Sequence, residues 1–239
     1  MAGTTSGHIA LAQSPLTPQT AEYQVNYGSI ELGTAKYDLP PVNEAGIYQY
    51  HFNSNLSLLL LSDERNITSE FKLDENNHNQ LLSLRYKQDR KGTGSDYMEQ
   101  TAFARQQGKI YTRYKNQRND FDYGKEIFDP LVIQLQLRLD LADHRETLEY
   151  SMIKSNKLDT YKFKIMGKEK IQLPSGSYDT IKLEVIRKSK KRQTFFWLAP
   201  DLSYLPIRLA HFKKGSKQLD IKLLNYQFSP LQTKLSTAE

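Results

Sequence analysis

The stretch that decides the fold is FDPLVIQLQLRLDL, residues 128–141. From Ile133 onward every second residue is apolar, which is the period of a half-buried strand. The stretch opens with Asp129 and Pro130, however, and this pair is typical of a helix N-cap followed by proline at the first helical position. Leu, Gln and Arg also favour helices, and apolar residues nearly all round the helical wheel indicate a helix that is buried on most sides. We therefore predict a helix over about residues 129–140.

The segments on both sides of this helix have the pattern of short antiparallel strands. Turn signals such as Gly28-Ser29, KGTGSD at 91–96 and PSGS at 174–177 recur about every ten residues, which is typical of an antiparallel meander. Fifteen tyrosines and ten phenylalanines also favour strands over helices. A closed or nearly closed arrangement would leave few exposed strand edges.

No change in composition divides the chain, so we predict a single β domain over residues 21–229. Residues 1–20 are small and polar and are interpreted as a flexible leader or the remnant of an export signal. Residues 230–239 are interpreted as a flexible tail. No apolar run approaches the length of a membrane-spanning helix.

The charge of the chain is unevenly distributed. Between Lys154 and Lys222 there are 17 Lys and Arg against 6 Asp and Glu, a local charge of +11. The other residues carry 16 against 21, or −5. Such asymmetry predicts an anionic partner, such as a membrane surface, lipopolysaccharide or nucleic acid. The alternative is a solvated, lysine-rich face of the sheet.

Motifs that support catalysis are missing from the sequence. Without cysteine there is no disulfide, thiolate metal site or cysteine nucleophile, and no G-x-S-x-G, phosphate-binding loop or H-E-x-x-H occurs. No two of the five histidines have the spacing of metal ligands. The acidic residues Asp120, Asp122 and Glu126 are interpreted as solvated loop residues. We predict that the protein is not an enzyme and has neither metal nor cofactor.

Aromatic residues on the basic strands permit two interpretations. Tyr161, Phe163, Phe195 and Phe196 could stack nucleic-acid bases, but no RNP-like motif occurs, so no nucleic-acid partner is expected. In RQTFFWLAP (192–200) Phe195 and Trp197 face one side of a strand, and Phe196 and its neighbour Leu198 face the other. Trp197 and Tyr204 could line an apolar ligand cavity or simply pack in the core.

Five segments resemble the DUF3108 family of exported bacterial proteins, whose function is unknown. They are YQVNYGSIELGTAKYDL (23–39), SEFKLD (69–74), FDPLVIQLQLRLDL (128–141), LPSGSYDTIKLEV (173–185) and TFFWLAPDLSYLPIRL (194–209). The resemblance implies export to the periplasm or cell envelope of a Gram-negative bacterium. It also implies a strongly curved antiparallel sheet or unclosed β-barrel, similar to the lipoprotein carriers LolA and LolB, with the helix at its concave face or mouth. It supplies no catalytic residues.

Two classes of function remain open. In the first, the space between sheet and helix binds an apolar ligand such as a lipid acyl chain, and the basic region 154–222 contacts an anionic membrane surface. The residues expected to bind the ligand are Leu131, Leu135, Leu139, Phe195, Trp197 and Tyr204. In the second, the protein is a structural or assembly module that binds another envelope protein and no small molecule.

Overall fold

The computed structural model describes residues 14–74, 76–124, 126–189 and 191–229. The strands are β1 (Gln19–Tyr27), β2 (Ile30–Leu39), β3 (Tyr48–Leu58), β4 (Leu61–Asp74), β5 (Asn77–Gly92), β6 (Tyr97–Ala104), β7 (Lys109–Tyr114), β8 (Gln117–Asp122), β9 (Ile127–Phe128), β10 (Leu148–Lys154), β11 (Lys157–Leu173), β12 (Gly176–Ile186), β13 (Arg192–Ala199), β14 (Leu205–Lys213) and β15 (Ser216–Phe228). The helices are α1 (Val132–Ala142) and two 3-10 turns, η1 (Arg105–Gln107) and η2 (Pro200–Leu202). Residues 1–13 of the expected leader and the expected tail at 230–239 lie outside the described residues.

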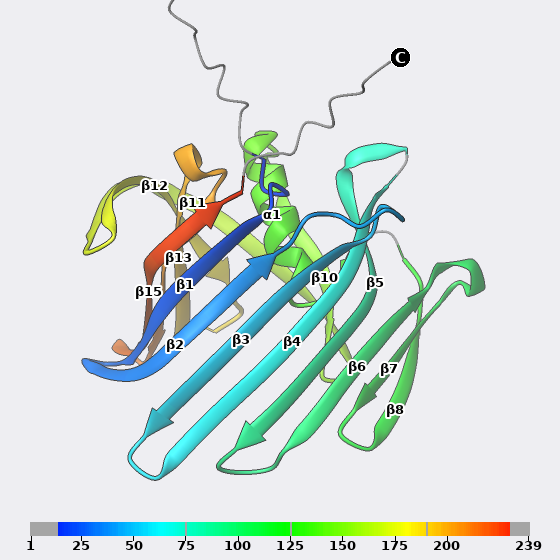
Figure 1. Cartoon of the computed structure of the whole chain (residues 1–239), viewed down its shortest axis with the longest axis horizontal. Coiled ribbons are helices and arrows are strands. Elements are labelled where there is room, and N and C mark those ends of the chain that lie inside the picture. Colours follow the sequence, from blue (N-terminus) through cyan, green and yellow to red (C-terminus); the bar gives the residue numbers. More distant parts are fainter. Residues whose placement is uncertain (1–13, 75, 125, 190, 230–239) are drawn as a thin grey trace, which may run out of the picture.

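All fifteen strands belong to one sheet, which winds around α1 (Figure 1). The sheet order is β8-β7-β6-β5-β4-β3-β2-β1-β15-β14-β13-β12-β11-β10-β9, so the first and last strands of the chain pair in the middle. Each neighbouring pair is antiparallel except β9 and β10, which are parallel. The predicted mostly β, strongly curved and unclosed architecture is confirmed.

The two edges of the sheet meet through side chains, at a contact that we call the seam. The backbone N–H of Ser155, in the β10–β11 turn, donates to the buried carboxylate of Glu99 on β6. The side-chain amide of Asn156 donates to Gln117 O on β8 at 3.0 Å. A small apolar cluster also spans the seam and consists of Phe103 on β6, Ile110 on β7 and Ile153 on β10.

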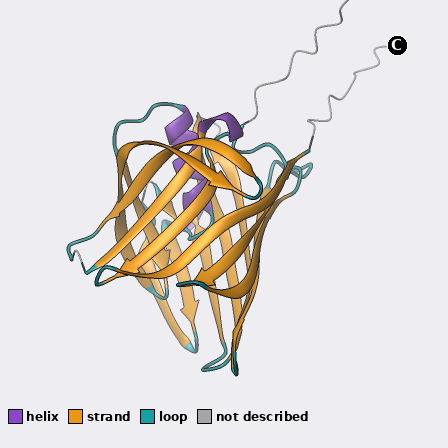
Figure 2. Cartoon of the chain, turned by 90° about the vertical axis from the view of Figure 1, so that its left-hand side faces the viewer, coloured by secondary structure: helices purple, strands orange, loops and turns teal. Residues whose placement is uncertain are grey.

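The predicted helix is confirmed, although it begins at Val132, three residues later than expected. It lies inside the curved sheet near one end (Figure 2), where strands surround it. Polar residues are therefore buried along with apolar ones, among them Gln136, Arg138 and Asp140. This enclosure explains why the sequence has no single apolar face, which a surface helix would show.

Candidate functional site

The N-terminus of α1 is fixed by a buried carboxylate. Asp129 Oδ1 accepts hydrogen bonds from the backbone N–H groups of Leu131 at 2.9 Å and Val132 at 3.0 Å. The same carboxylate accepts from the hydroxyls of Ser69 on β4 at 2.6 Å and Ser83 on β5 at 2.8 Å. Burial raises the pKa of Asp129, although these hydrogen bonds oppose the shift. One side chain therefore caps the helix, as the sequence predicted, and also ties it to two strands.

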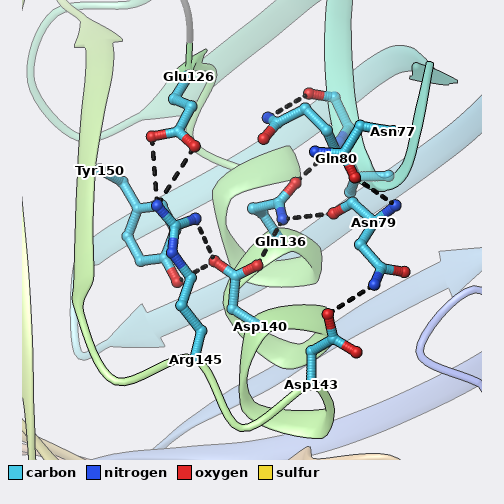
Figure 3. A network of polar contacts seen from close by, with 10 residues as sticks. Asn77, Asn79, Gln80, Glu126, Gln136, Asp140, Asp143, Arg145 and Tyr150 are labelled. Atoms are coloured by element: carbon cyan, nitrogen blue, oxygen red, sulfur yellow. Dashed lines mark hydrogen bonds and ion pairs between the residues drawn. The ribbon is translucent and has the colours of Figure 1, made fainter. Parts of the chain in front are cut away.

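A polar network holds the rest of α1 against β5 and β10 (Figure 3). The side-chain amide of Gln136 donates to Asn79 O and accepts from Leu81 N, both at 2.8 Å, so it pairs with β5 much as a neighbouring strand would. Gln136 Nε2 also donates to Asp140 Oδ1 at 2.8 Å, and Asp140 Oδ2 accepts from Tyr150 OH at 2.7 Å. The helix is therefore a fixed part of the structure rather than a loosely attached cover.

A cavity of about 280 Å3 lies between the first turn of α1 and the concave face of the sheet. This volume is slightly below the range of ~300–1,000 Å3 that is usual for ligand pockets. Most of the wall is apolar or aromatic, and its main contributors are Tyr37, Tyr50, Ile133, Met152, Phe163 and Phe196. An apolar cavity of this size can enclose a single hydrocarbon chain but not a bulky polar substrate.

Three tyrosines form one wall of the cavity. The ring of Tyr37 packs against those of Tyr23 and Tyr50, with both pairs of centroids 5.7 Å apart. Burial raises the pKa of all three phenols, and that of Tyr37 reaches about 12 despite a hydrogen bond with Gln134. Each hydroxyl is therefore neutral near pH 7, so this wall is polarisable but uncharged.

Arg138 is a buried cation close to the same tyrosines, Tyr23 and Tyr50. Its Nε donates to Ser203 O at 3.0 Å and its Nη2 donates to Gln19 Oε1 at 3.1 Å. No carboxylate in the described residues forms an ion pair with it. Burial lowers the pKa of Arg138, but a guanidinium remains charged in proteins. This charge is therefore stabilised by hydrogen bonds to neutral oxygen atoms and not by an anion.

Cationic side chains stand at the mouth of the cavity. Lys154 is the last residue of β10 and Arg187 directly follows β12; both are exposed, and both line the cavity. The β10–β11 and β12–β13 turns begin at these residues, so the cavity opens toward these turns. An apolar interior with cations at its mouth suits an amphiphile with an apolar chain and an anionic head group.

The six residues that the sequence predicted to bind a ligand do not line this cavity. Four of them pack in or against the main core around α1, namely Leu131, Leu135, Leu139 and Tyr204. Successive leucines of this set are four residues apart, so they lie on the same side of the helical turns. The cavity lies beside a different part of the helix, at Pro130, Ile133 and Gln134.

The other two residues, Phe195 and Trp197, lie on the face of β13 that is turned away from α1. Their neighbours Phe196 and Leu198 contact the main core, as the alternation of a strand requires. Trp197 Nε1 donates to Glu169 Oε2 on β11 at 2.6 Å. Alternation along a strand shows which side chains share a face, but it does not say which face is the inner one.

The residues that do line the cavity come from strands far apart in the sequence. Met152 lies on β10 and Phe163 on β11, whereas Tyr37 and Tyr50 lie on β2 and β3. For Tyr50 alone, the sequence offers a signal in the alternation of aromatic residues in YQYHF, residues 48–52, which places its first, third and fifth side chains on one face.

A charged cluster on the outer face explains why Trp197 is buried there. Arg208 lies over the indole ring, with Cζ 5.1 Å from the centroid. Arg208 also pairs with Asp220 through two hydrogen bonds, at 2.7 and 2.8 Å, and Lys217 Nζ contributes a third at 3.0 Å. Burial acts to raise the pKa of Asp220, but these hydrogen bonds outweigh it and hold the pKa below its ordinary value.

We expect Asp220→Asn to lower the free energy of unfolding by about 2 kcal/mol near pH 7, because it breaks a largely buried ion pair. A carboxyl whose pKa is lowered by folding stabilises the protein at pH values above its unfolded-state pKa of about 3.9. This stabilisation is lost as the pH falls through the folded-state pKa. Urea unfolding at a series of pH values measures the effect. The two proteins should converge in strong acid, and a difference that is independent of pH would contradict the assignment.

The acidic residues that were interpreted as solvated form surface ion pairs. Asp120 and Asp122 lie 3.2 and 2.8 Å from Lys109 Nζ, and Glu126 lies 3.3 Å from Arg145. Among residues 14–74, 76–124, 126–189 and 191–229, no three His, Cys, Asp or Glu side chains gather in a way that could hold a metal ion. In the same part of the chain, no helix has the length and apolar character needed to cross a membrane.

Comparison with known proteins places this fold in a recognised family. The chain is similar to the crystal structure of a β-barrel-like protein with domain of unknown function DUF1849 from Brucella abortus, with a TM-score of 0.58, 9% identity, and coverage of 90% of this chain and 98% of that one. A protein assigned as a lipoprotein from Parabacteroides distasonis is 10% identical, with a TM-score of 0.36 and coverage of 90% and 97%. No curated protein matches the sequence. The model of the DUF3108 family, described as proteins of unknown function, matches residues 22–222. The chain therefore belongs to the DUF3108 family.

Proposed function

We propose that this protein is a non-enzymatic component of the cell envelope that binds an apolar chain, such as the acyl chain of an anionic lipid, in the cavity beside α1. The observation that supports this proposal is the cavity itself, which is about 280 Å3 in volume and walled by apolar and aromatic side chains. An apolar wall that faces an unfilled space is unfavourable, because its atoms lose dispersion contacts. A cavity held open by a fixed helix is consistent with an occupant.

The position of the cations decides how the chain would be oriented. Lys154 and Arg187 are exposed at the mouth, where they can contact an anionic head group in water. The three neutral tyrosines lie in the interior wall, where the hydrocarbon end would be enclosed. The chain would therefore enter tail first, with its head group at the turns.

We expect Met152→Trp to weaken binding of a fluorescently labelled fatty acid at least tenfold, because the larger side chain occupies the cavity. Overpacking of this kind costs about 1–3 kcal/mol of stability, so circular dichroism should show that the fold is retained. Phe195→Trp is the matched control, since it introduces the same side chain on the outer face, and we expect its affinity to be unchanged.

Native mass spectrometry of protein purified from the bacterial envelope, followed by lipid extraction, identifies the natural occupant. A co-purifying lipid that is present in the wild type and in Phe195→Trp, but absent from Met152→Trp, is the expected result. The proposal fails if the wild type carries no lipid and also does not bind the labelled chain.

A second candidate function is favoured by a larger groove on the outer face. This groove, about 710 Å3 in volume, runs across β4 to β8 and is lined by exposed cationic and aromatic side chains, including Arg85, Lys87, Tyr111 and Arg113. It is open and shallow, which suits a protein surface better than a small molecule. An assembly module would use this groove, and Tyr111→Ser with Arg113→Glu would then abolish a specific envelope complex while lipid binding stayed unchanged.

A further inference from the structure

Seven turns gather at one end of the sheet, which we call the hairpin end. Because neighbouring strands are antiparallel, the β1–β2, β3–β4, β5–β6, β7–β8, β10–β11, β12–β13 and β14–β15 turns all lie at this end. Figures 1 and 2 show that it is opposite the end that holds α1. The mouth of the cavity, at Lys154 and Arg187, lies on the hairpin end as well.

The tip of the β3–β4 hairpin is apolar and almost fully exposed. Leu59 and Leu60 are 97% and 96% exposed, and Leu61 is 56% exposed. Leu59 also has a φ of +54°, in the left-handed region where glycine and asparagine are favoured and leucine is strained. Neither burial nor turn geometry accounts for leucine at this tip.

Exposed lysines lie at other turns of the same hairpin end. They lie in or beside five different turns, at Lys91, Lys115, Lys157, Lys188, Lys191 and Lys214. None of them forms an ion pair with another described residue. Within the described residues that link strands at this end, Asp96 is the one acidic side chain. The hairpin end therefore combines protruding leucines with more basic than acidic side chains in its turns.

We propose that the hairpin end docks on an anionic phospholipid surface, with Leu59 and Leu60 inserted among the lipid chains and the lysines in contact with phosphate groups. Apolar side chains that enter the acyl region together with cations at the head-group level are the physical basis of interfacial membrane binding. Docking in this orientation places the mouth of the cavity against the membrane, so that an acyl chain could move between them without crossing water. The docking itself does not depend on whether the cavity is occupied.

The leucines are tested by co-sedimentation with vesicles of phosphatidylcholine that contain one part in three of phosphatidylglycerol. We expect the double variant Leu59→Asn, Leu60→Asn to bind these vesicles about 100-fold more weakly. It removes the two leucine side chains that would be buried among the lipid chains in the docked protein. Asparagine suits the left-handed turn, so the unfolding temperature should not fall. The matched control is Val42→Asn, an exposed apolar residue at the other end, and its binding should equal that of the wild type.

The lysines are tested on the same vesicles. Replacement of Lys188, Lys191 and Lys214 by glutamine should weaken binding about tenfold or more, and salt should weaken wild-type binding in the same way. The matched control replaces three exposed lysines within strands, namely Lys36, Lys87 and Lys164. The proposal is overturned if the wild type does not bind the vesicles or if it binds equally to pure phosphatidylcholine. It is also overturned if either control variant loses as much vesicle binding as the variant that it controls.

Docking and ligand binding can fail independently, so their tests remain distinct. The Leu59→Asn, Leu60→Asn protein should still bind a labelled fatty acid in solution, and Met152→Trp should still sediment with anionic vesicles. If Met152→Trp also lost vesicle binding while it stayed folded, the membrane contact would lie in the cavity and not at the leucine tip, and the docking proposal would be wrong.

Discussion

Asp129→Ala should lower the free energy of unfolding by about 4 kcal/mol, one of the two largest effects that we expect from a single substitution. Loss of an N-cap costs about 1–2 kcal/mol. Each buried hydrogen-bonding group that is left without a partner costs a further ~1–3 kcal/mol, and the substitution removes the acceptor of the Ser69 and Ser83 hydroxyls. Urea denaturation followed by circular dichroism measures the change.

The graded control at the same position is Asp129→Asn. Its Oδ1 can still accept from the backbone of Leu131 and Val132, and its Nδ2 can donate to the hydroxyl of Ser83, because a hydroxyl also accepts. We expect a loss of about 1–2 kcal/mol for this variant. Equal stability of wild type and Asp129→Ala would mean that the helix is held by packing alone.

Arg138→Ala should lower the free energy of unfolding by a similar amount, about 4 kcal/mol, for a different reason. The side chain is 2% exposed, so its removal leaves a cavity in the core, and truncation of large buried side chains costs about 3–5 kcal/mol. Ser203 O and Gln19 Oε1 also lose their shared donor. The measurement is again the midpoint and slope of urea unfolding.

Arg138→Met separates packing from charge. Methionine fills most of the volume and removes the desolvation penalty of the guanidinium, which no carboxylate in the described residues offsets. We expect it to lose about 2 kcal/mol less than the alanine variant. If methionine were as damaging as alanine, the hydrogen bonds of the guanidinium and not its volume would fix α1 to Gln19 and to the turn at Ser203.

The helix could be predicted because its signals are local. Asp129 and Pro130 mark its start within two residues, and the same carboxylate that suggested a cap performs that function in the structure. The meander could be predicted for a similar reason, since each turn is encoded by a few residues such as Gly28. The helix starts three residues later than predicted, because capping by Asp129 precedes the first helical residue, Val132, and it ends two residues later, at Ala142.

The cavity could not be predicted because its walls are assembled over long sequence distances. Tyr37 and Phe163 line the same space, yet more than a hundred positions separate them, and their juxtaposition depends on how far the whole sheet curls. The choice between Phe195 and Phe196 as the inward residue depends on the same curl. A strand pattern fixes which side chains share a face, but the global twist decides which face is enclosed.

The seam means that no strand pairing closes the circumference of this sheet. In a closed barrel the diameter is set by the number of strands and their stagger, so it cannot widen without the loss of backbone hydrogen bonds. Here the circumference is completed by the Asn156–Gln117 and Ser155–Glu99 contacts and a small apolar cluster, none of which belongs to a strand ladder. Separation of the two edges would therefore leave every strand ladder intact. The inner width of the sheet is set by a few side-chain contacts and not by strand pairing.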